Sequence, residues 1–511
     1  MKFKGLIISL LLPALLLSGC AEETPDSAGV DGIVAVSSAE EDPSAQSALP
    51  AEFALPYDPE TSLDPITCPD GIQQTVGCLL YEGLFSLDQA LEPQPRLCSA
   101  AEYEPEAMTR ILTRRPDVTF SDGSPLTAKD VSASLRRAMA SPRYQARLSG
   151  IRSVSAEENT VTLSLLSPNT GLPALLDIPI VKAGTENLSV PLGTGPYHWG
   201  SGESGEYLAA TADHWSGAPQ PIDRIALVRC DDSEAARYQF TSHAVQLLST
   251  DLTGTDPLSA AGSFAFLDAD TTVLQYVGLN LSRSLLSDAA VRQALSAGID
   301  RESIAEAYLS GHALPAQFPV SPVSSLYPSE METAYSHSSY VQRLEDAGLN
   351  SGNPRRLTLL VNQENAFKIS VARYIASSLS AGDLTVEVKI LPWSDYLSAL
   401  SAGDYDLFYG EARLTADWDL APLVGTGGVL NPGGYTDPLT DQLLSAFAAS
   451  PDRAYAMSAL CSRLQRQAPI LPVCFKRTSL LTQVGVAEGL SPTAADPFHG
   501  LENWRIYLAE N

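Results

Sequence analysis

Hydrophobic and polar positions alternate and then change period between residues 118 and 138. Val118 and Phe120 alternate with polar neighbours, as the end of a β-strand does. The Asp-Gly pair that follows is typical of a tight turn, because glycine tolerates positive φ. Thr127 precedes Asp130 by three residues, the spacing of a capping box at a helix start, and apolar residues then recur at helical spacing. The stretch therefore predicts a strand, a turn and a capped helix.

A second pattern predicts a βαβ unit in the last third of the chain. Residues 357–361 form an apolar run with the length of a strand, and residues 369–379 place apolar side chains on one helical face. Residues 384–390 alternate between apolar and polar again. Two strands joined in this way pair in parallel, with a right-handed crossover.

Two glycine- or asparagine-containing turns predict β-hairpins. Residues 161–165 alternate after Glu158-Asn159, which predicts a hairpin with residues 152–154. The glycines at 200, 202 and 205 have the spacing of a dinucleotide-binding loop. A strand pattern follows them, however, where that site needs a helix, so we expect a hairpin turn here as well.

Other local signals mark helix starts and the final strand. Ser287 is expected to cap a helix, and Asp437 followed by Pro438 predicts another helix start. Residues 470–475 are expected to form the last long strand.

The composition is that of a folded, multidomain protein. The chain has 511 residues, 44% of them hydrophobic and 18% charged, which indicates two or three domains. The net charge of −28 argues against binding to nucleic acid or to anionic lipid, which need basic surfaces. The seven cysteines show no CxxC spacing, so neither a zinc site nor another cofactor is expected.

The N-terminus has the pattern of an export signal. Lys2 and Lys4 precede an apolar run at residues 6–17, and the sequence Leu-Ser-Gly-Cys follows, ending at Cys20. This ending resembles a bacterial lipobox, which implies cleavage of residues 1–20 and lipidation of Cys20. The alternative is an ordinary secretory signal. Residues 21–50 contain no Lys or Arg and are expected to form a disordered acidic tether to the membrane.

Residues 118–131 closely resemble the signature of the family 5 solute-binding proteins, the extracytoplasmic receptors of ABC importers for peptides, nickel and related solutes. Residues 291–301, with Val-Arg-Gln-Ala-Leu and Ile-Asp-Arg, resemble a second family pattern. Shorter resemblances occur at residues 63–65, 81–85, 91–95, 135–138 and 193–197. Together they extend over about residues 63–507.

The resemblance implies an α/β, two-lobed periplasmic-binding-protein type II fold with an extra inserted domain. Two strands that cross between the lobes would form the hinge. The implied divisions are domain I at 51–65, 186–275 and 475–511, domain II at 66–185, and domain III, the second lobe, at 276–474.

Catalytic motifs are absent from the sequence. It contains no HExxH, GxSxG or P-loop pattern, and its six histidines are widely spaced. We therefore expect a binding protein and not an enzyme. A hydrolase whose residues meet only in space is the alternative.

The candidate ligand-binding residues follow Asp404. Residues 404–406 resemble the start of a strand of the family, and in its peptide-binding members an aspartate after that strand pairs with the amino terminus of the peptide. The resemblance implies this role for Asp417 or Asp419. Glu411 stands where those members have Trp. Arg413 is expected to clamp a carboxylate in a bidentate manner, unless it simply pairs with Glu411.

Three further residues are candidates near the same region. Trp418 either stacks on the ligand or belongs to the core. Tyr276 and Asn280 lie near the predicted crossover between the lobes and are candidate binding residues.

The sequence thus predicts a monomeric receptor on the extracytoplasmic face of the cell membrane, anchored through lipidated Cys20. It would capture peptides and deliver them to the membrane subunits of an ABC permease. The alternatives are a receptor for another solute, such as a nickel chelate or an oligosaccharide, and a signalling or chaperone-like lipoprotein that reuses the fold.

Overall fold

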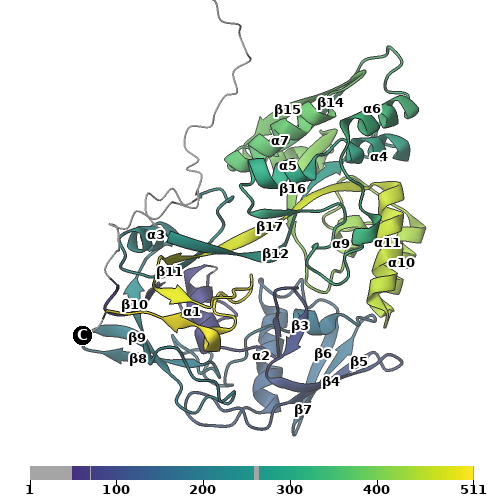
Figure 1. Cartoon of the computed structure of the whole chain (residues 1–511). Coiled ribbons are helices and arrows are strands. Elements are labelled where there is room, and N and C mark those ends of the chain that lie inside the picture. The colour runs from purple at the N-terminus through teal and green to yellow at the C-terminus, as the bar shows by residue number, and fades with distance from the viewer. Residues whose placement is uncertain (1–48, 70, 258–263, 510–511) are drawn as a thin grey trace, which may run out of the picture. The chain divides into compact units, whose positions relative to one another are not determined.

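The computed structural model describes residues 49–69, 71–257 and 264–509 (Figure 1). The predicted signal peptide, Cys20 and nearly all of the predicted tether lie outside these residues.

A first sheet has the strand order β1-β10-β9-β8. β1 pairs with β10 in parallel, and the other neighbours are antiparallel. The β8–β9 hairpin closes between Gly202 and Gly205, whose φ is 108°, so the hairpin turn predicted at this glycine-rich stretch is confirmed. The elements of this region are β1 (Ala54–Tyr57), α1 (Ile72–Leu80), β8 (Tyr197–Gly202), β9 (Gly205–Ala210), β10 (Arg224–Arg229) and α3 (Ser233–Thr241).

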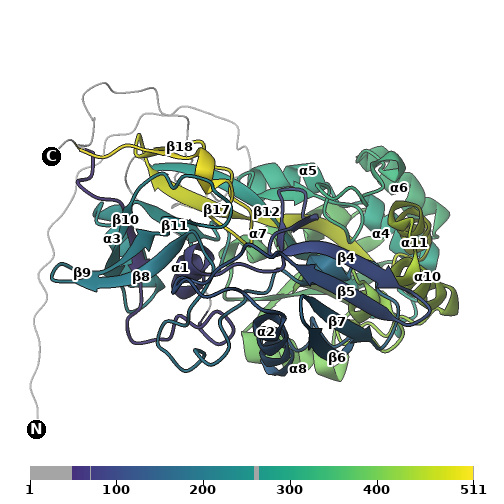
Figure 2. The same ribbon diagram turned by 90° about the horizontal axis from the view of Figure 1, so that it is seen from below.

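A second, antiparallel sheet has the order β4-β5-β7-β6. Helix α2 (Ala128–Ala140) packs along β6 and β7, as Figure 2 shows. Thr127 and Asp130 form both hydrogen bonds of the predicted capping box, and the β6–β7 hairpin turns at Glu158 and Asn159 as predicted. The strands of this region are β2 (Phe85–Leu87), β3 (Pro93–Pro95), β4 (Cys98–Glu104), β5 (Thr109–Arg114), β6 (Ile151–Glu157) and β7 (Thr160–Leu165).

The largest sheet has the order β11-β17-β12-β16-β14-β15, and β13 pairs with β17 outside this path. β12 and β17 are its longest strands, with 16 and 14 residues, and they lie side by side in antiparallel register (Figure 1). The predicted final strand at residues 470–475 is therefore the first half of β17. The strands are β11 (Leu247–Thr250), β12 (Phe264–Leu279), β13 (Ala313–Pro315), β14 (Arg355–Asn362), β15 (Leu384–Leu391), β16 (Leu407–Arg413) and β17 (Ile470–Gln483).

The predicted βαβ unit is β14, α7 and β15, with β14 and β15 paired in parallel. Asp437 caps α10 with Pro438 in its first turn, as predicted. The predicted cap at Ser287 is wrong by one residue, because the side chain of Asp288 accepts the hydrogen bond from Ala290 N. The helices are α4 (Ala289–Ala297), α5 (Arg301–Ser303), α6 (His337–Asp346), α7 (Ala366–Leu379), α8 (Trp393–Ala402), α9 (Ala421–Val424), α10 (Pro438–Ala449) and α11 (Arg453–Gln467).

Short elements complete the described chain. They are the 3-10 turns η1 (Leu172–Leu175), η3 (Ser329–Met331) and η4 (Leu501–Asn503), the π-helical turn η2 (Ile304–Tyr308), and the strand pair β18 (Ala487–Glu488) and β19 (Arg505–Ile506).

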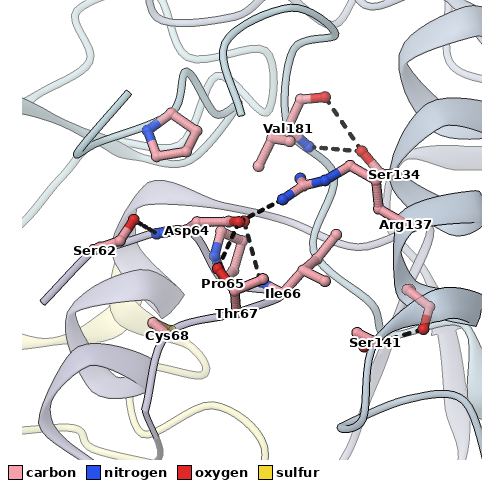
Figure 3. A network of polar contacts seen from close by, with 12 residues as sticks. Ser62, Asp64, Pro65, Ile66, Thr67, Cys68, Ser134, Arg137, Ser141 and Val181 are labelled. Carbon is pink, nitrogen blue, oxygen red and sulfur yellow. Dashed lines mark hydrogen bonds and ion pairs between the residues drawn. The ribbon is translucent and has the colours of Figure 1, made fainter. Parts of the chain in front are cut away.

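Two motifs that were noted separately in the sequence meet in one polar network (Figure 3). The guanidinium of Arg137, on α2, donates to the carboxylate of Asp64, which is 3% exposed. Asp64 also accepts from Thr67 Oγ1 at 2.8 Å, and Ser134 on α2 bonds both to the N–H and to the carbonyl of Val181. The signature helix is therefore tied to two distant chain segments.

Close backbone contact explains the Gly-Thr-Gly-Pro-Tyr motif. A Cβ at Gly193 would lie 2.0 Å from the carbonyl oxygen of Leu80, and one at Gly195 would lie 2.3 Å from that of Leu79. The chain thus passes against the end of α1 at a distance that only glycine permits.

Candidate functional site

Parallel strands define one candidate edge of the large sheet. β14 is parallel both to β15 and to β16, so the strands end at the same edge, with Asn362, Leu391 and Arg413 as their last residues. In open α/β sheets, ligands bind outside the carboxyl ends of such strands. The predicted binding residues that follow Asp404 lie on β16 and in the turn after it.

Glu411 and Arg413 project to the same side of β16, since buried Ala412 separates them. Glu411 accepts a hydrogen bond from Gln275 Nε2 at 2.9 Å, and its Oε2 lies 3.3 Å from Lys368 Nζ and 3.9 Å from Lys476 Nζ. Burial alone would raise the pKa of Glu411, but the two ammonium groups and the amide lower it below its ordinary value.

Arg413 is exposed, and its guanidinium makes no ion pair or hydrogen bond within the part of the chain that the structure describes. The alternative that it pairs with Glu411 is therefore wrong, since lysines occupy that carboxylate. An unpaired guanidinium at the end of a strand is available for a carboxylate from outside the protein.

Asp417 lies in the turn after β16 and is 4% exposed. Its Oδ1 accepts from Thr415 Oγ1 at 2.5 Å and from Asp419 N at 3.3 Å. Its Oδ2 accepts from Asn169 Nδ2 at 2.9 Å, across 248 residues of sequence. The guanidinium of Arg453 donates to the carbonyl oxygen of Asp417. The carboxylate is thus held firmly, and it has neutral donors instead of a direct salt bridge among the described residues.

Asp419 reaches solvent and accepts from Ala421 N at 3.0 Å, at the start of α9. Its pKa is raised, because partial desolvation and the nearby charge of Asp417 both oppose ionisation. Asp417 and Asp419 therefore provide two neighbouring carboxylates with different degrees of exposure.

Two other candidate binding residues, Tyr276 and Asn280, make contacts within the fold. Tyr276 is buried edge-to-face against Phe408, with ring centroids 5.7 Å apart, and burial raises the pKa of its hydroxyl. Asn280 Nδ2 donates to the carbonyl oxygens of Gly403 and Tyr405, both at 3.0 Å.

Trp418 is 1% exposed and packs against Phe475 at 5.8 Å between centroids. Its φ of 56° is in the left-handed region, which is uncommon for a residue other than glycine and marks a sharp turn between Asp417 and Asp419.

Sequence reasoning missed the partners of these side chains. Asn169 and Arg453 carry no local signal, because they reach Asp417 from segments far away in sequence. Lys368 had a weak signal: it lies in the first turn of α7, directly after the carboxyl end of β14. A search of the loops that follow parallel strands finds it.

Metal-binding and membrane-spanning elements were also sought. No group of three or more His, Cys, Asp or Glu side chains in residues 49–69, 71–257 and 264–509 is arranged to hold a metal ion. None of the helices formed by those residues has the length and apolar character needed to cross a bilayer.

Comparison with known proteins identifies the family. Residues 92–425 match the model of the bacterial extracellular solute-binding proteins, family 5 Middle. A glutathione-binding protein GsiB from Pectobacterium atrosepticum is 25% identical over 424 residues, which is 77% of this chain and 82% of that protein.

Solved structures show the same fold. A nickel ABC transporter protein from Bacillus halodurans has a TM-score of 0.73 and 20% identity, with 87% of this chain and 98% of that chain covered. A putative peptide binding protein AppA from Clostridium difficile has a TM-score of 0.70 and 17% identity, with 90% and 100% covered.

The predicted α/β, two-lobed type II fold with its extra domain is confirmed by these structural matches. The family match covers well over half of the chain. The protein therefore belongs to the family 5 bacterial extracellular solute-binding proteins: it is an extracytoplasmic solute receptor of an ABC importer, and not an enzyme.

Proposed function

We propose that the solute is a short peptide, bound at the carboxyl edge of the parallel strands. The observation that carries this proposal is the pairing at β16: Glu411 is neutralised by Lys368 and Lys476, while Arg413 on the same side has no partner among the described residues. A free guanidinium recognises a carboxylate through two parallel N–H donors. The C-terminal carboxylate of a peptide fits this role.

The amino terminus of the peptide is assigned to Asp417, with the more exposed Asp419 beside it. Each oxygen of Asp417 accepts from neutral or backbone donors, so an incoming ammonium group would be the first direct ion-pair partner of this carboxylate among the groups that the structure describes. In this proposal Trp418, Tyr276 and Asn280 support the surrounding backbone through their packing and hydrogen bonds.

The relatives support a peptide and suggest the alternative. GsiB is named as a glutathione-binding protein, and glutathione is a tripeptide. The structural relative from Bacillus halodurans is named for nickel. A nickel chelate is the second candidate; because the described residues offer no metal-binding group, such a chelate would be recognised through the carboxylates of its organic part.

The remaining parts of the proposal concern the whole chain. Domains I and II would form one lobe and domain III the other, with the divisions stated above. Ligand contacts made only when the lobes close would shift the population towards the closed form, which docks as a monomer on the permease.

Lipid on Cys20 would hold the receptor at the membrane, and the mass of the N-terminal peptide from the native host tests this modification.

The test of the function uses protein that has been unfolded and refolded to remove bound solute. Thermal unfolding is recorded with di- to pentapeptides, glutathione, nickel–histidine and oligosaccharides. A ligand at 100 times its Kd adds about 2.7 kcal/mol to the free energy of unfolding. We expect a stabilising shift with peptides that disappears in Arg413→Ala. A shift with an oligosaccharide alone would refute the peptide assignment.

A further inference from the structure

The segment Asn169-Thr170-Gly171, between β7 and η1, contacts residues that lie on and around α10 and α11. Thr170 N donates to the carbonyl oxygen of Ala448 at 2.9 Å, and Thr170 Oγ1 donates to that of Ser450 at 2.9 Å. Asn169 Nδ2 donates to Asp417 Oδ2 at 2.9 Å. Thr170 Oγ1 also lies 3.3 Å from the carbonyl oxygen of Ala448, so four hydrogen bonds from two adjacent residues join this segment to the region that contains Asp417.

Arginines reinforce both sides of the contact. Arg110, which is 7% exposed on β5, donates to the carbonyl oxygen of Thr170 at 3.2 Å. Arg453, on α11, donates to the carbonyl oxygen of Asp417, and its guanidinium lies so close to Gly171 that a Cβ there would be 2.6 Å from Nη1. The segment and its acceptor surface are therefore each fixed by a buried or partly buried cation.

Asn169 has a specific effect on the Asp417 carboxylate. Thr415 and Asp419 engage Oδ1, and Asn169 is the donor to Oδ2. Because both oxygens have a donor, the plane of the carboxylate is fixed. The amide of Asn169 is neutral, so it orients the carboxylate without cancelling the charge that an ammonium group would meet.

We infer that the 169–171 segment is a clasp, and that Asn169 is a positioning residue for Asp417. The clasp fastens the region of the second sheet to the turn after β16 and presents Asp417 to the amino group of the ligand. The clasp rests on the contacts described here, and the positioning role rests on the proposed peptide function.

By the divisions proposed above, the clasp joins domain II to domain III, so it is tested on the full-length protein by amide hydrogen exchange, both without ligand and with saturating tri-alanine. Asn169→Ala and Thr170→Val each remove one donor, and Asn159→Ala, in the β6–β7 turn, is the matched control. We expect exchange about tenfold faster in peptides that cover residues 166–172 and 446–452 in both clasp variants, and no change in the control. Unchanged exchange in both clasp variants would overturn the clasp.

The positioning role is tested by calorimetry with tri-alanine and N-acetyl-tri-alanine. Asn169→Ala should weaken tri-alanine binding about tenfold, since a hydrogen bond to a charged group is lost. It should leave the affinity for the acetylated peptide, which lacks the ammonium group, unchanged. Equal losses for both peptides would show a merely structural role and overturn the positioning.

A third variant separates orientation from loss of packing. In Asn169→Asp, a carboxylate replaces the donor to Asp417 Oδ2 at about pH 7, so the two like charges repel and the Asp417 carboxylate leaves its fixed orientation, which should weaken tri-alanine binding relative to wild type. Binding should recover towards about pH 5, as one proton becomes shared between the two groups; a pH profile identical to that of Asn169→Ala would contradict the inference. If no peptide of the thermal-unfolding series binds the wild-type protein, the proposed function fails, and hydrogen exchange on the ligand-free protein alone decides the clasp.

Discussion

The ammonium group of Lys368 lies 3.3 Å from the carboxylate of Glu411, whereas Arg413, two residues further along β16, has no ion-pair partner among the described residues. Lys476 approaches the same carboxylate at 3.9 Å and also pairs with Asp251. The protein itself thus neutralises the carboxylate of Glu411, whereas the described residues provide no counter-charge for the guanidinium of Arg413. This division of charge is the basis of the proposal that the ligand carries an anionic group.

The ion pairs of Glu411 with Lys368 and Lys476 should make the free energy of unfolding depend on pH. Because the pKa of Glu411 is lowered in the folded protein, its contribution is present above the unfolded glutamate pKa of about 4.3 and is lost as the pH falls through the folded value. We expect Glu411→Gln to reduce the free energy of unfolding at neutral pH, and the difference from wild type to shrink below about pH 4. Urea unfolding at a series of pH values measures this.

Glu387→Gln is the control for that series. Glu387 pairs with Arg356 on the surface, where both side chains are mostly exposed, so its replacement should change stability by less than about 0.5 kcal/mol. A Glu411→Gln effect that stays constant from neutral to acidic pH would contradict the assigned electrostatics.

Arg413 should act on ligand affinity and not on stability. It is exposed and has no partner within residues 49–69, 71–257 and 264–509, so Arg413→Ala should change the free energy of unfolding by less than about 0.5 kcal/mol. Arg413→Lys should recover only part of the affinity lost in Arg413→Ala, because an ammonium group lacks the two parallel donors. Calorimetry with tri-alanine and its C-terminal amide checks this.

The C-terminal amide of tri-alanine shows whether a loss of affinity in Arg413→Ala comes from the lost contact with the ligand carboxylate or from another effect of the substitution. It should bind wild type and Arg413→Ala about equally, since it has no carboxylate for the guanidinium to hold. A loss of equal size for the free acid and the amide would remove Arg413 from carboxylate recognition.

The ion pair between Arg137 and Asp64 should contribute strongly to stability. In Arg137→Met the buried carboxylate of Asp64 loses its cation, which should cost about 3 kcal/mol. Lys129→Met, on the exposed face of the same helix, should be nearly neutral. Denaturant unfolding compares the two variants, and equal midpoints would show that the network in Figure 3 contributes little.

The Gly-Thr-Gly-Pro-Tyr motif should be intolerant of even one methyl group. Gly195→Ala would place its Cβ against backbone atoms of Leu79 and Leu80, so we expect a loss of about 3 kcal/mol or more, or failure to fold. A Cβ added to Gly150 would meet open space, so Gly150→Ala is the matched control. Soluble yield and thermal midpoint measure both, and a stable Gly195→Ala variant would refute the steric reading.

Local features of the fold were predictable from the sequence. The capping box at Thr127 and the cap at Asp437 depend on side chains within a few residues of one another, and the parallel βαβ unit depends on three consecutive periodic stretches; the structure has each of them. The helix predicted to begin after Ser287 begins after Asp288 instead, because both residue types cap helices and sequence alone does not choose between neighbours.

The candidate site was only partly predictable. The sequence indicated the segment that contains Glu411, Arg413 and Asp417, but not which of these charges the protein itself neutralises. That depends on Lys368 and Asn169, which reach the segment through the fold and not through sequence proximity. The burial of Trp418 likewise follows from its contact with Phe475, on a strand that lies far away in sequence.

The pairing of β12 with β17 also governs when the protein is able to fold. Phe264 pairs with Gln483 at one end of the two strands, and Gly278 pairs with Ile470 at the other, so the centre of the large sheet joins segments that are synthesised far apart in time. Contacts of such long range form late and slowly. A chain that emerges on the outer side of the membrane from its N-terminus thus remains without its central strand pair until nearly its last residues have crossed, and truncation shortly before residue 470 would leave β12 with an open edge.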